Sequence, residues 1–198
     1  MVGKLVLATS NAGKLAELRD LLGADFDLHA QSEFGVDDAD ETGLTFVENA
    51  ILKARHAAAA TGLPALGDDS GLCVDALQGA PGLYSARYAG THGDSEENID
   101  KLLSELAETN DAQRGARFVC VLALVRHAND PQPVIAEGVW HGRILHARQG
   151  GNGFGYDPVF YSPAHGCSAA ELEPAIKNRD SHRGQALAAL KRQLVPQV

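Results

Sequence analysis

The sequence has no run of lysine or arginine, and its formal net charge is -9. It therefore lacks the basic surface with which proteins bind a nucleic-acid backbone, and we expect no nucleic-acid partner. An acidic protein that acts on a polyanion needs a cation between the two negative charges.

Cysteine is scarce: Cys73, Cys120 and Cys167 lie far apart in the chain, and no C-x-x-C pair occurs. This spacing argues against a zinc site and against a disulfide framework. We expect three buried or reduced thiols, as in a cytosolic protein.

Long apolar stretches are also missing. The apolar run near the N-terminus, from Leu5 to Ala8, is too short for the core of a signal peptide, and no later stretch has the length of a membrane span. We therefore expect a cytoplasmic protein without a membrane partner. With no internal repeat and with 44% hydrophobic and 22% charged residues, the composition predicts one globular domain over residues 1–198.

The spacing of apolar residues predicts an alternation of strands and helices. The expected strands are residues 4–8, two short runs within 64–76, residues 117–125, residues 133–147 with a break at Gly142, and a short strand around 156–161. Four helices are expected. The first follows Gly13 and carries Leu15, Leu18, Leu21 and Leu22, and the second runs from a capping box at Thr45 and Glu48 to about Ala60. The third is capped by Ser95, and the last begins at Ser181 after an irregular stretch.

The turn after the first strand places a hydroxyl, an amide and an ammonium around a glycine that opens a helix, at Thr9, Asn11 and Lys14. Free backbone N–H groups and the positive end of the helix dipole favour an anion there. The alternative is an ordinary helix cap from Ser10 or Asn11 with Lys14 in solvent.

Two adjacent carboxylates, Asp68 and Asp69, stand between glycines in the segment Gly67–Gly71. Because successive side chains of a strand point to opposite faces, one of them should point into a cleft. Oxygen ligands of this kind suit Mg²⁺, which also binds substrate phosphates. The alternative is a turn, since Asp, Ser and Gly are also common in turns.

A second acidic pair, Asp40 and Glu41, precedes the helix at Thr45, and Lys53 lies on that helix. An isolated acidic pair near a helix start is most often a solvated complement to the dipole. By themselves these residues indicate no particular chemistry.

Segment Gly150–Pro158 is rich in glycine and carries two aromatic rings, Phe154 and Tyr156. Such a backbone can lie against a flat ligand, and both rings offer faces on which a base can stack. The spacing differs from the dinucleotide fingerprint, and a tight glycine loop with core aromatics is the alternative.

Near the C-terminus, Lys177, His182 and Arg183 lie at or near the start of the last expected helix. Cationic side chains in a first helical turn oppose the helix dipole, so something else must favour them. A ligand with carbonyl oxygens or phosphate would supply that compensation.

In this order the motifs resemble the inosine triphosphate pyrophosphatase family over nearly the whole chain. The residues that carry the resemblance are Thr9–Lys14, Glu41–Ala50, Asp68–Leu72, Ala80–Gly82, Ser85–Tyr88, Gly153–Pro158 and Ser181–Gly184. The resemblance implies an elongated mixed α/β fold with a long sheet flanked by helices, two lobes with a cleft between them, and a homodimer.

The resemblance also implies roles. Asp69 would accept a proton and bind Mg²⁺, joined by Asp40 or Glu41; Asp40 is one methylene shorter than the glutamate that relatives often have there. The implied phosphate and sugar contacts are Thr9, Ser10, Asn11, Ala12, Gly13, Lys14 and Ser70, with Lys53 as a further phosphate contact. Asp68 is a further candidate site residue. The implied base pocket comprises Phe154, Gly155, Tyr156, Asp157, Lys177, His182 and Arg183.

Together these roles predict hydrolysis of ITP, dITP and XTP to the monophosphate and pyrophosphate, which would keep deaminated purines out of nucleic acids. Fixed donors can pair with the keto oxygen at purine position 6 but not with the amino group of adenine. Two alternatives stay open: a related pyrophosphatase that acts on modified pyrimidine or other nucleotides with the same metal chemistry, and a regulatory module that binds nucleotides without turnover.

Overall fold

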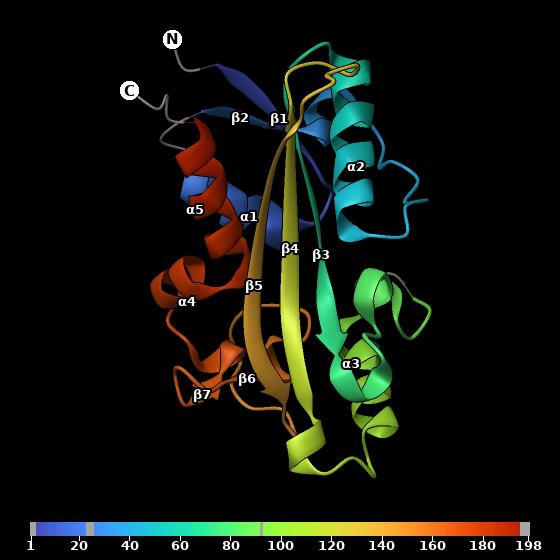
Figure 1. The fold of residues 1–198 in the computed structure, drawn as a ribbon, viewed down its shortest axis with the longest axis vertical. Coiled ribbons are helices and arrows are strands. Elements are labelled where there is room, and N and C mark those ends of the chain that lie inside the picture. Colours follow the sequence, from blue (N-terminus) through green and yellow to red (C-terminus); the bar gives the residue numbers. More distant parts are fainter. Residues whose placement is uncertain (1–2, 23–25, 92, 195–198) are drawn as a thin grey trace. The chain divides into compact units, whose positions relative to one another are not determined.

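The structure is a computed structural model that describes residues 3–22, 26–91 and 93–194 (Figure 1). Residue 92 lies outside the described residues. In chain order the strands and α-helices are β1 Lys4–Ala8, α1 Ala12–Leu22, β2 Asp27–Ala30, α2 Phe46–Thr61, β3 Ala65–Val74, α3 Ser95–Glu105, β4 Gly115–Val125, β5 Val134–Ile144, β6 Phe160–Ser162, β7 Cys167–Ser168, α4 Pro174–Asp180 and α5 His182–Leu194.

The seven strands form one sheet in the order β2-β1-β3-β4-β5-β6-β7. Strand β1 pairs in parallel with β2 and β3, with Val6 opposite Ala65, whereas β6 pairs antiparallel with β5 and β7. The sheet is therefore mixed and flanked by helices, which confirms the predicted fold class.

The chain divides into two compact units. Unit 1 comprises the residues up to Asp69, Cys120–Gly138 and the residues from Arg183 on; unit 2 comprises Ser70–Val119 and Val139–His182. Strands β3, β4 and β5 contribute residues to both units. The expectation of one domain over residues 1–198 stays a prediction.

In unit 1, leucines of several elements form a buried cluster, among them Leu5 and Leu7 of β1, Leu18 of α1 and Leu187 of α5. Leu66 of β3 belongs to the same cluster, so this face of the strands is covered by α1 and α5. The next residue, Gly67, faces α2 instead, because a Cβ atom built there would lie 2.1 Å from the Ala50 carbonyl oxygen. Unit 1 thus has helices on both faces of β3.

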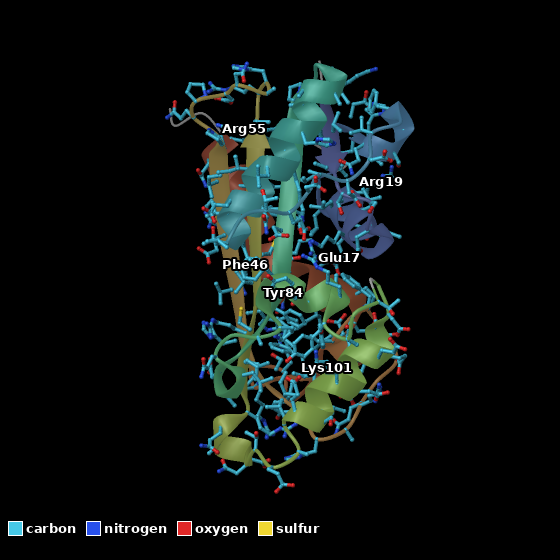
Figure 2. The ribbon with its side chains drawn as sticks, turned by 90° about the vertical axis from the view of Figure 1, so that its right-hand side faces the viewer. Glu17, Arg19, Phe46, Arg55, Tyr84 and Lys101 are labelled. Atoms are coloured by element: carbon cyan, nitrogen blue, oxygen red, sulfur yellow. The ribbon has the colours of Figure 1, made fainter. Side chains whose placement is uncertain are left out.

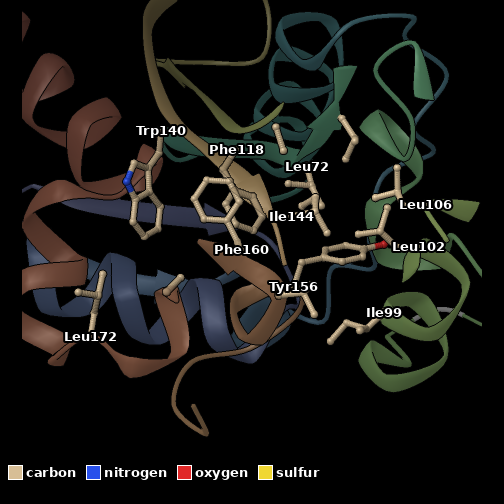
Figure 3. Close-up of a cluster of buried hydrophobic side chains, with 14 residues drawn as sticks. Leu72, Ile99, Leu102, Leu106, Phe118, Trp140, Ile144, Tyr156, Phe160 and Leu172 are labelled. Atoms are coloured by element: carbon tan, nitrogen blue, oxygen red, sulfur yellow. The ribbon is translucent and has the colours of Figure 1, made fainter. Parts of the chain in front are cut away.

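Aromatic rings fill the core of unit 2 (Figure 3). The Phe160 ring lies 4.6 Å from Phe118 and 5.0 Å from Trp140, measured between ring centroids. Ile99 and Leu102 of α3 pack into the same cluster. Burial of these large apolar side chains stabilises the unit.

Several predicted elements are confirmed. Strand β1 has the expected bounds, and α2 begins after Thr45, whose hydroxyl oxygen accepts a hydrogen bond from the Glu48 backbone N–H. The Glu48 carboxylate accepts in turn from the Thr45 hydroxyl and the Leu44 N–H. Cys73, Cys120 and Cys167 are free thiols, as expected. None of the helices in the described part of the chain is long and apolar enough to cross a bilayer.

Other predictions were wrong in detail. The segment Gly67–Gly71 is not a turn between two short strands but lies inside β3. Asp94, one residue before Ser95, caps α3 with its carboxylate. Residues 157–159 form a 3₁₀ turn before β6, and part of the expected irregular stretch is helix α4.

Gly67→Ala tests the contact between β3 and α2. We expect the free energy of unfolding to fall by about 1–3 kcal/mol, because the new methyl group meets backbone atoms of α2 that cannot turn aside. Chemical denaturation measures the change. Gly3→Ala is the control, since a Cβ atom at Gly3 meets nothing within 4 Å, and equal stability of the two variants would contradict the prediction.

Candidate functional site

Strand β3 presents its two carboxylates to opposite faces of the sheet. Asp68 lies two residues after Leu66 and therefore on the same face, which α1 and α5 cover. Asp69 lies two residues after Gly67, on the face that α2 covers. Both are buried, with 1% and 5% of their surface exposed. The sequence predicted that one of them points into a cleft; the structure buries both and gives them different partners.

Asp68 is neutralised by two cations from distant parts of the chain. Its Oδ1 lies 2.6 Å from Lys14 Nζ of α1, and its Oδ2 lies 2.8 Å from Arg183 Nε of α5. Arg183 also pairs with Glu17, which is labelled in Figure 2. Burial alone would raise the pKa of Asp68, but Arg183 and Lys14 outweigh it and hold that pKa well below its ordinary value. Asp68 is therefore a fixed negative charge.

Asp69 is held more loosely. Its Oδ1 lies 2.7 Å from Lys53 Nζ of α2, and Oδ2 is buried without a hydrogen-bond partner among the described residues. Burial raises the pKa of Asp69, against the opposing charge of Lys53. A buried carboxylate oxygen needs a hydrogen-bond donor, a water molecule, a proton or a cation as its partner.

Lys53 brings a second carboxylate to Asp69. Its Nζ lies 2.5 Å from Glu41 Oε1, so one ammonium joins Glu41 and Asp69. The side chain of Asp40 is exposed. The sequence left open whether Asp40 or Glu41 acts together with Asp69. The structure pairs Glu41 with the same ammonium as Asp69.

The turn before α1 forms the helix cap that the sequence offered as the alternative to an anion site. Asn11 caps the helix, since its Oδ1 accepts from the Lys14 N–H at 3.0 Å, and Thr9 Oγ1 accepts from the Asn11 N–H at 3.2 Å. The Ser10 hydroxyl donates to the Asp38 carboxylate. The idea that Lys14 is solvated was wrong, because its side chain is 14% exposed and paired with Asp68. Ala12 and Gly13 form the first turn of α1, where backbone N–H groups have no partner within the helix.

In unit 2, the glycine-rich loop folds around a buried carboxylate. Asp157 Oδ2 accepts from the Phe154 N–H at 2.8 Å and from Lys177 Nζ at 2.6 Å. Lys177 Nζ also lies 4.8 Å from the centre of the Phe154 ring, which is 38% exposed. Gly153 and Gly155 have φ angles of 78° and 60°, a left-handed conformation that favours glycine. The loop thus holds an exposed ring and an ammonium together.

The prediction that Tyr156 offers a ring for stacking is corrected. Tyr156 lies in the hydrophobic core of unit 2, and its hydroxyl donates to the Ser85 carbonyl at 2.9 Å. His182 is also packed, with its ring stacked on Phe118 at 4.7 Å and 12°. Of the two rings in the loop, Phe154 is the one that is exposed.

The proposed reason for the C-terminal cations was also incomplete. Lys177 lies in the last turn of α4, where the helix dipole favours a cation. Arg183 does lie in the first turn of α5, but Asp68 and Glu17 of the protein itself compensate it. No ligand is required to explain either charge.

Two polar residues were missed in the sequence. Glu17 lies three positions after Lys14 on α1, a spacing that puts both on one helix face, and this signal was available. Asn49 is buried beside alanines on α2, and its side chain accepts from the Gly43 N–H. A polar residue on an otherwise apolar helix face was the signal for Asn49.

The residues around Asp69 fit a magnesium ion whose coordination shell a substrate would complete. Within the described ranges, no group of three or more His, Cys, Asp or Glu side chains is placed to hold a metal ion. Mg²⁺, however, is commonly bound by one or two carboxylates together with phosphate oxygens and water. Glu41 and Asp69 supply two carboxylates, and Asp69 Oδ2 is an acceptor in need of a partner.

The chain was compared with known proteins. The model of the Ham1 family matches residues 5–193. The dITP/XTP pyrophosphatase of Pseudomonas syringae pv. tomato is 59% identical over 191 residues, covering 96% of each chain, and that of Vibrio parahaemolyticus is 57% identical over 98% of each.

Solved structures agree. A HAM1 protein from Coxiella burnetii superposes with a TM-score of 0.89 at 54% identity over 98% of both chains. The Ham1 protein of Staphylococcus aureus has a TM-score of 0.85 at 41% identity, covering 96% of this chain and 97% of that one. Sequence and fold thus agree over nearly the full length, and the chain belongs to the Ham1 family.

Proposed function

We propose that this protein hydrolyses dITP, ITP and XTP to the nucleoside monophosphate and pyrophosphate. The names of its relatives support the reaction. One feature of unit 1 supports the chemistry: the Glu41 and Asp69 carboxylates both pair with the Lys53 ammonium, and the second oxygen of Asp69 has no hydrogen-bond partner among the described residues. A regulatory module that only binds polyanions would gain nothing from these added negative charges.

In unit 1 we assign Glu41 and Asp69 as the residues that would hold Mg²⁺, which when bound offsets the charge of the triphosphate. The first turn of α1, after Thr9 to Asn11, offers backbone N–H groups to phosphate oxygens. Asp69 orients a water molecule and takes its proton as the water oxygen attacks the α-phosphorus. The bond from that phosphorus to the bridging oxygen breaks, and pyrophosphate leaves with the electron pair.

In unit 2 we assign the recognition of the base to the glycine-rich loop. The exposed face of Phe154 can stack on a purine, and Lys177, held by Asp157, can donate to a keto oxygen. Adenine presents an amino group at this position and leaves the donor unpaired. Arg183 is better assigned as the partner of Asp68 in unit 1 than as a direct contact of the base.

Other assignments rest on the resemblance to the family. Ser70, next to Asp69 in β3, is proposed to contact the substrate, and a homodimer in the cytoplasm is proposed for the assembly and its location. Gel filtration with light scattering tests the homodimer.

The experiment that tests the function measures pyrophosphate and orthophosphate released from dITP, ITP, XTP, ATP, GTP and dUTP, with and without Mg²⁺. We expect dITP, ITP and XTP to release pyrophosphate, and to do so only when Mg²⁺ is present. Turnover of dUTP above dITP would favour the pyrimidine alternative, and tight binding of dITP without release of pyrophosphate would favour the regulatory module. Equal turnover of ATP would contradict the proposed specificity.

Lys177→Met tests the recognition of the base. We expect the KM for dITP to rise at least roughly tenfold, because a charged donor to the base contributes about 1.5–3 kcal/mol. The ratio of kcat/KM for dITP to kcat/KM for ATP should fall as well. Lys101→Met removes an exposed lysine of α3 and is the control. Unchanged KM values for both nucleotides would remove Lys177 from the pocket.

A further inference from the structure

Asn49 is a buried amide whose place on α2 is not explained by packing. It is 1% exposed and lies beside Ala50, with Ala54 and Ala57 further along the buried side of the helix. Buried amides almost always make hydrogen bonds, and the Asn49 Oδ1 atom accepts from the Gly43 N–H at 2.8 Å. The amide therefore holds the backbone of the segment before the helix.

This segment fits tightly against the first turn of α2. A Cβ atom at Gly43 would lie 2.6 Å from Glu48 Cβ and 2.7 Å from Asn49 Oδ1. The next N–H, of Leu44, donates to the Glu48 carboxylate at 2.9 Å, and Thr45 caps the helix. Three consecutive residues are thus fixed to one helix end.

Glu41 lies two residues before Gly43 and is held by the same helix. Lys53 follows Asn49 by four positions, one helical turn, so both side chains lie on one face of α2. Asn49 holds the backbone at Gly43, and Lys53 Nζ holds the Glu41 carboxylate at 2.5 Å and Asp69 Oδ1 at 2.7 Å. The Asn49 contact thus fixes the backbone two residues after Glu41, close to the point where Lys53 holds the Glu41 carboxylate.

We propose that Asn49 is a positioning residue that sets the affinity of the Glu41 and Asp69 pair for a divalent cation by fixing the backbone at Gly43. This inference rests on the proposed function, which assigns the cation to that pair. Loss of a residue that orients a metal ligand typically weakens metal binding by about 10–100-fold.

The test measures Mn²⁺ binding to the full chain without nucleotide, from the electron paramagnetic resonance signal of free Mn²⁺. We expect Asn49→Leu, which keeps the branched shape of the side chain and removes the acceptor, to raise the Kd for Mn²⁺ at least roughly tenfold. Gly43→Ala should have the same effect with Asn49 intact, because its methyl group displaces the segment. Thr61→Val is the control, since it removes a side-chain hydrogen bond at the other end of α2.

A merely structural role would lower stability without changing Mn²⁺ binding, so Asn49→Leu and Gly43→Ala with the wild-type Kd would overturn the proposal. So would an equal rise in Kd in Thr61→Val, or a wild-type protein that binds no Mn²⁺. If Asn49→Leu does not fold, Gly43→Ala decides alone.

Kinetics separate this proposal from the function on which it rests. At saturating Mn²⁺, we expect the kcat of Asn49→Leu on dITP to return to within about threefold of wild type, because the variant lacks affinity and not a reacting group. If every variant releases pyrophosphate and binds Mn²⁺ as tightly as wild type, the proposed role of Asn49 fails and the proposed function stands. Absence of pyrophosphate release by the wild type would remove the proposed function, whatever the Mn²⁺ result.

Discussion

Asp69→Asn is expected to lower the kcat for dITP hydrolysis by about a thousandfold, within the range of about 10²–10⁴ for a lost general base. The amide cannot take the proton of the attacking water and is a weaker ligand for a cation. Folding should be preserved, since the change removes a buried negative charge whose second oxygen has no partner in the described part of the chain. Lys53 also keeps its contact with Glu41.

The measurement is single-turnover hydrolysis of dITP together with a thermal melt of the same sample. Asp75→Asn is the matched control, because it makes the same change directly after β3 at a side chain that is 63% exposed. We expect this control to have wild-type kinetics. A kcat within threefold of wild type in Asp69→Asn would show that another group activates the water.

Arg183→Met is expected to have the largest effect on stability. The guanidinium is 2% exposed and compensates Asp68 and Glu17, so its removal leaves buried carboxylates with fewer partners. Breaking a buried pair by removing one partner costs about 3–5 kcal/mol. At about 2–4 °C per kcal/mol for a chain of this size, the Tm should fall by roughly 6–20 °C.

Two further variants make this prediction specific. Arg179→Met removes an arginine that is 73% exposed and should change stability by less than about 1 kcal/mol. The double variant Arg183→Met and Glu17→Gln should recover part of the loss, because it also removes one of the two negative charges that Arg183 compensates. If instead Arg183→Met keeps the wild-type Tm and loses only the preference for dITP over ATP, Arg183 contacts the base as the resemblance implies.

The sequence by itself determined the features that depend on neighbours in the chain. The apolar run of β1, the cap of α2 at Thr45 and the period of leucines in α1 are local patterns, and each is found where it was expected. The ordered motifs determined the family in the same way, because they are read directly from the chain.

The tertiary structure alone decided how Asp68 and Asp69 differ. Alternation along a strand predicts only that adjacent side chains diverge, and it gives no partner for either. Asp68 meets Arg183, which is 115 positions away, and Asp69 meets Lys53 of the helix on the other face. The electrostatic character of each carboxylate comes from these long-range contacts.

Contacts between distant segments also decided the roles of Glu41 and Gly67. Composition could not separate Asp40 from Glu41, because the choice depends on which side chain reaches Lys53 across space. Gly67 suggested a turn by its residue type, but close packing of α2 on β3 requires a glycine there without any turn. Residue types set which local structures are possible, and contacts between segments distant in the chain select among them.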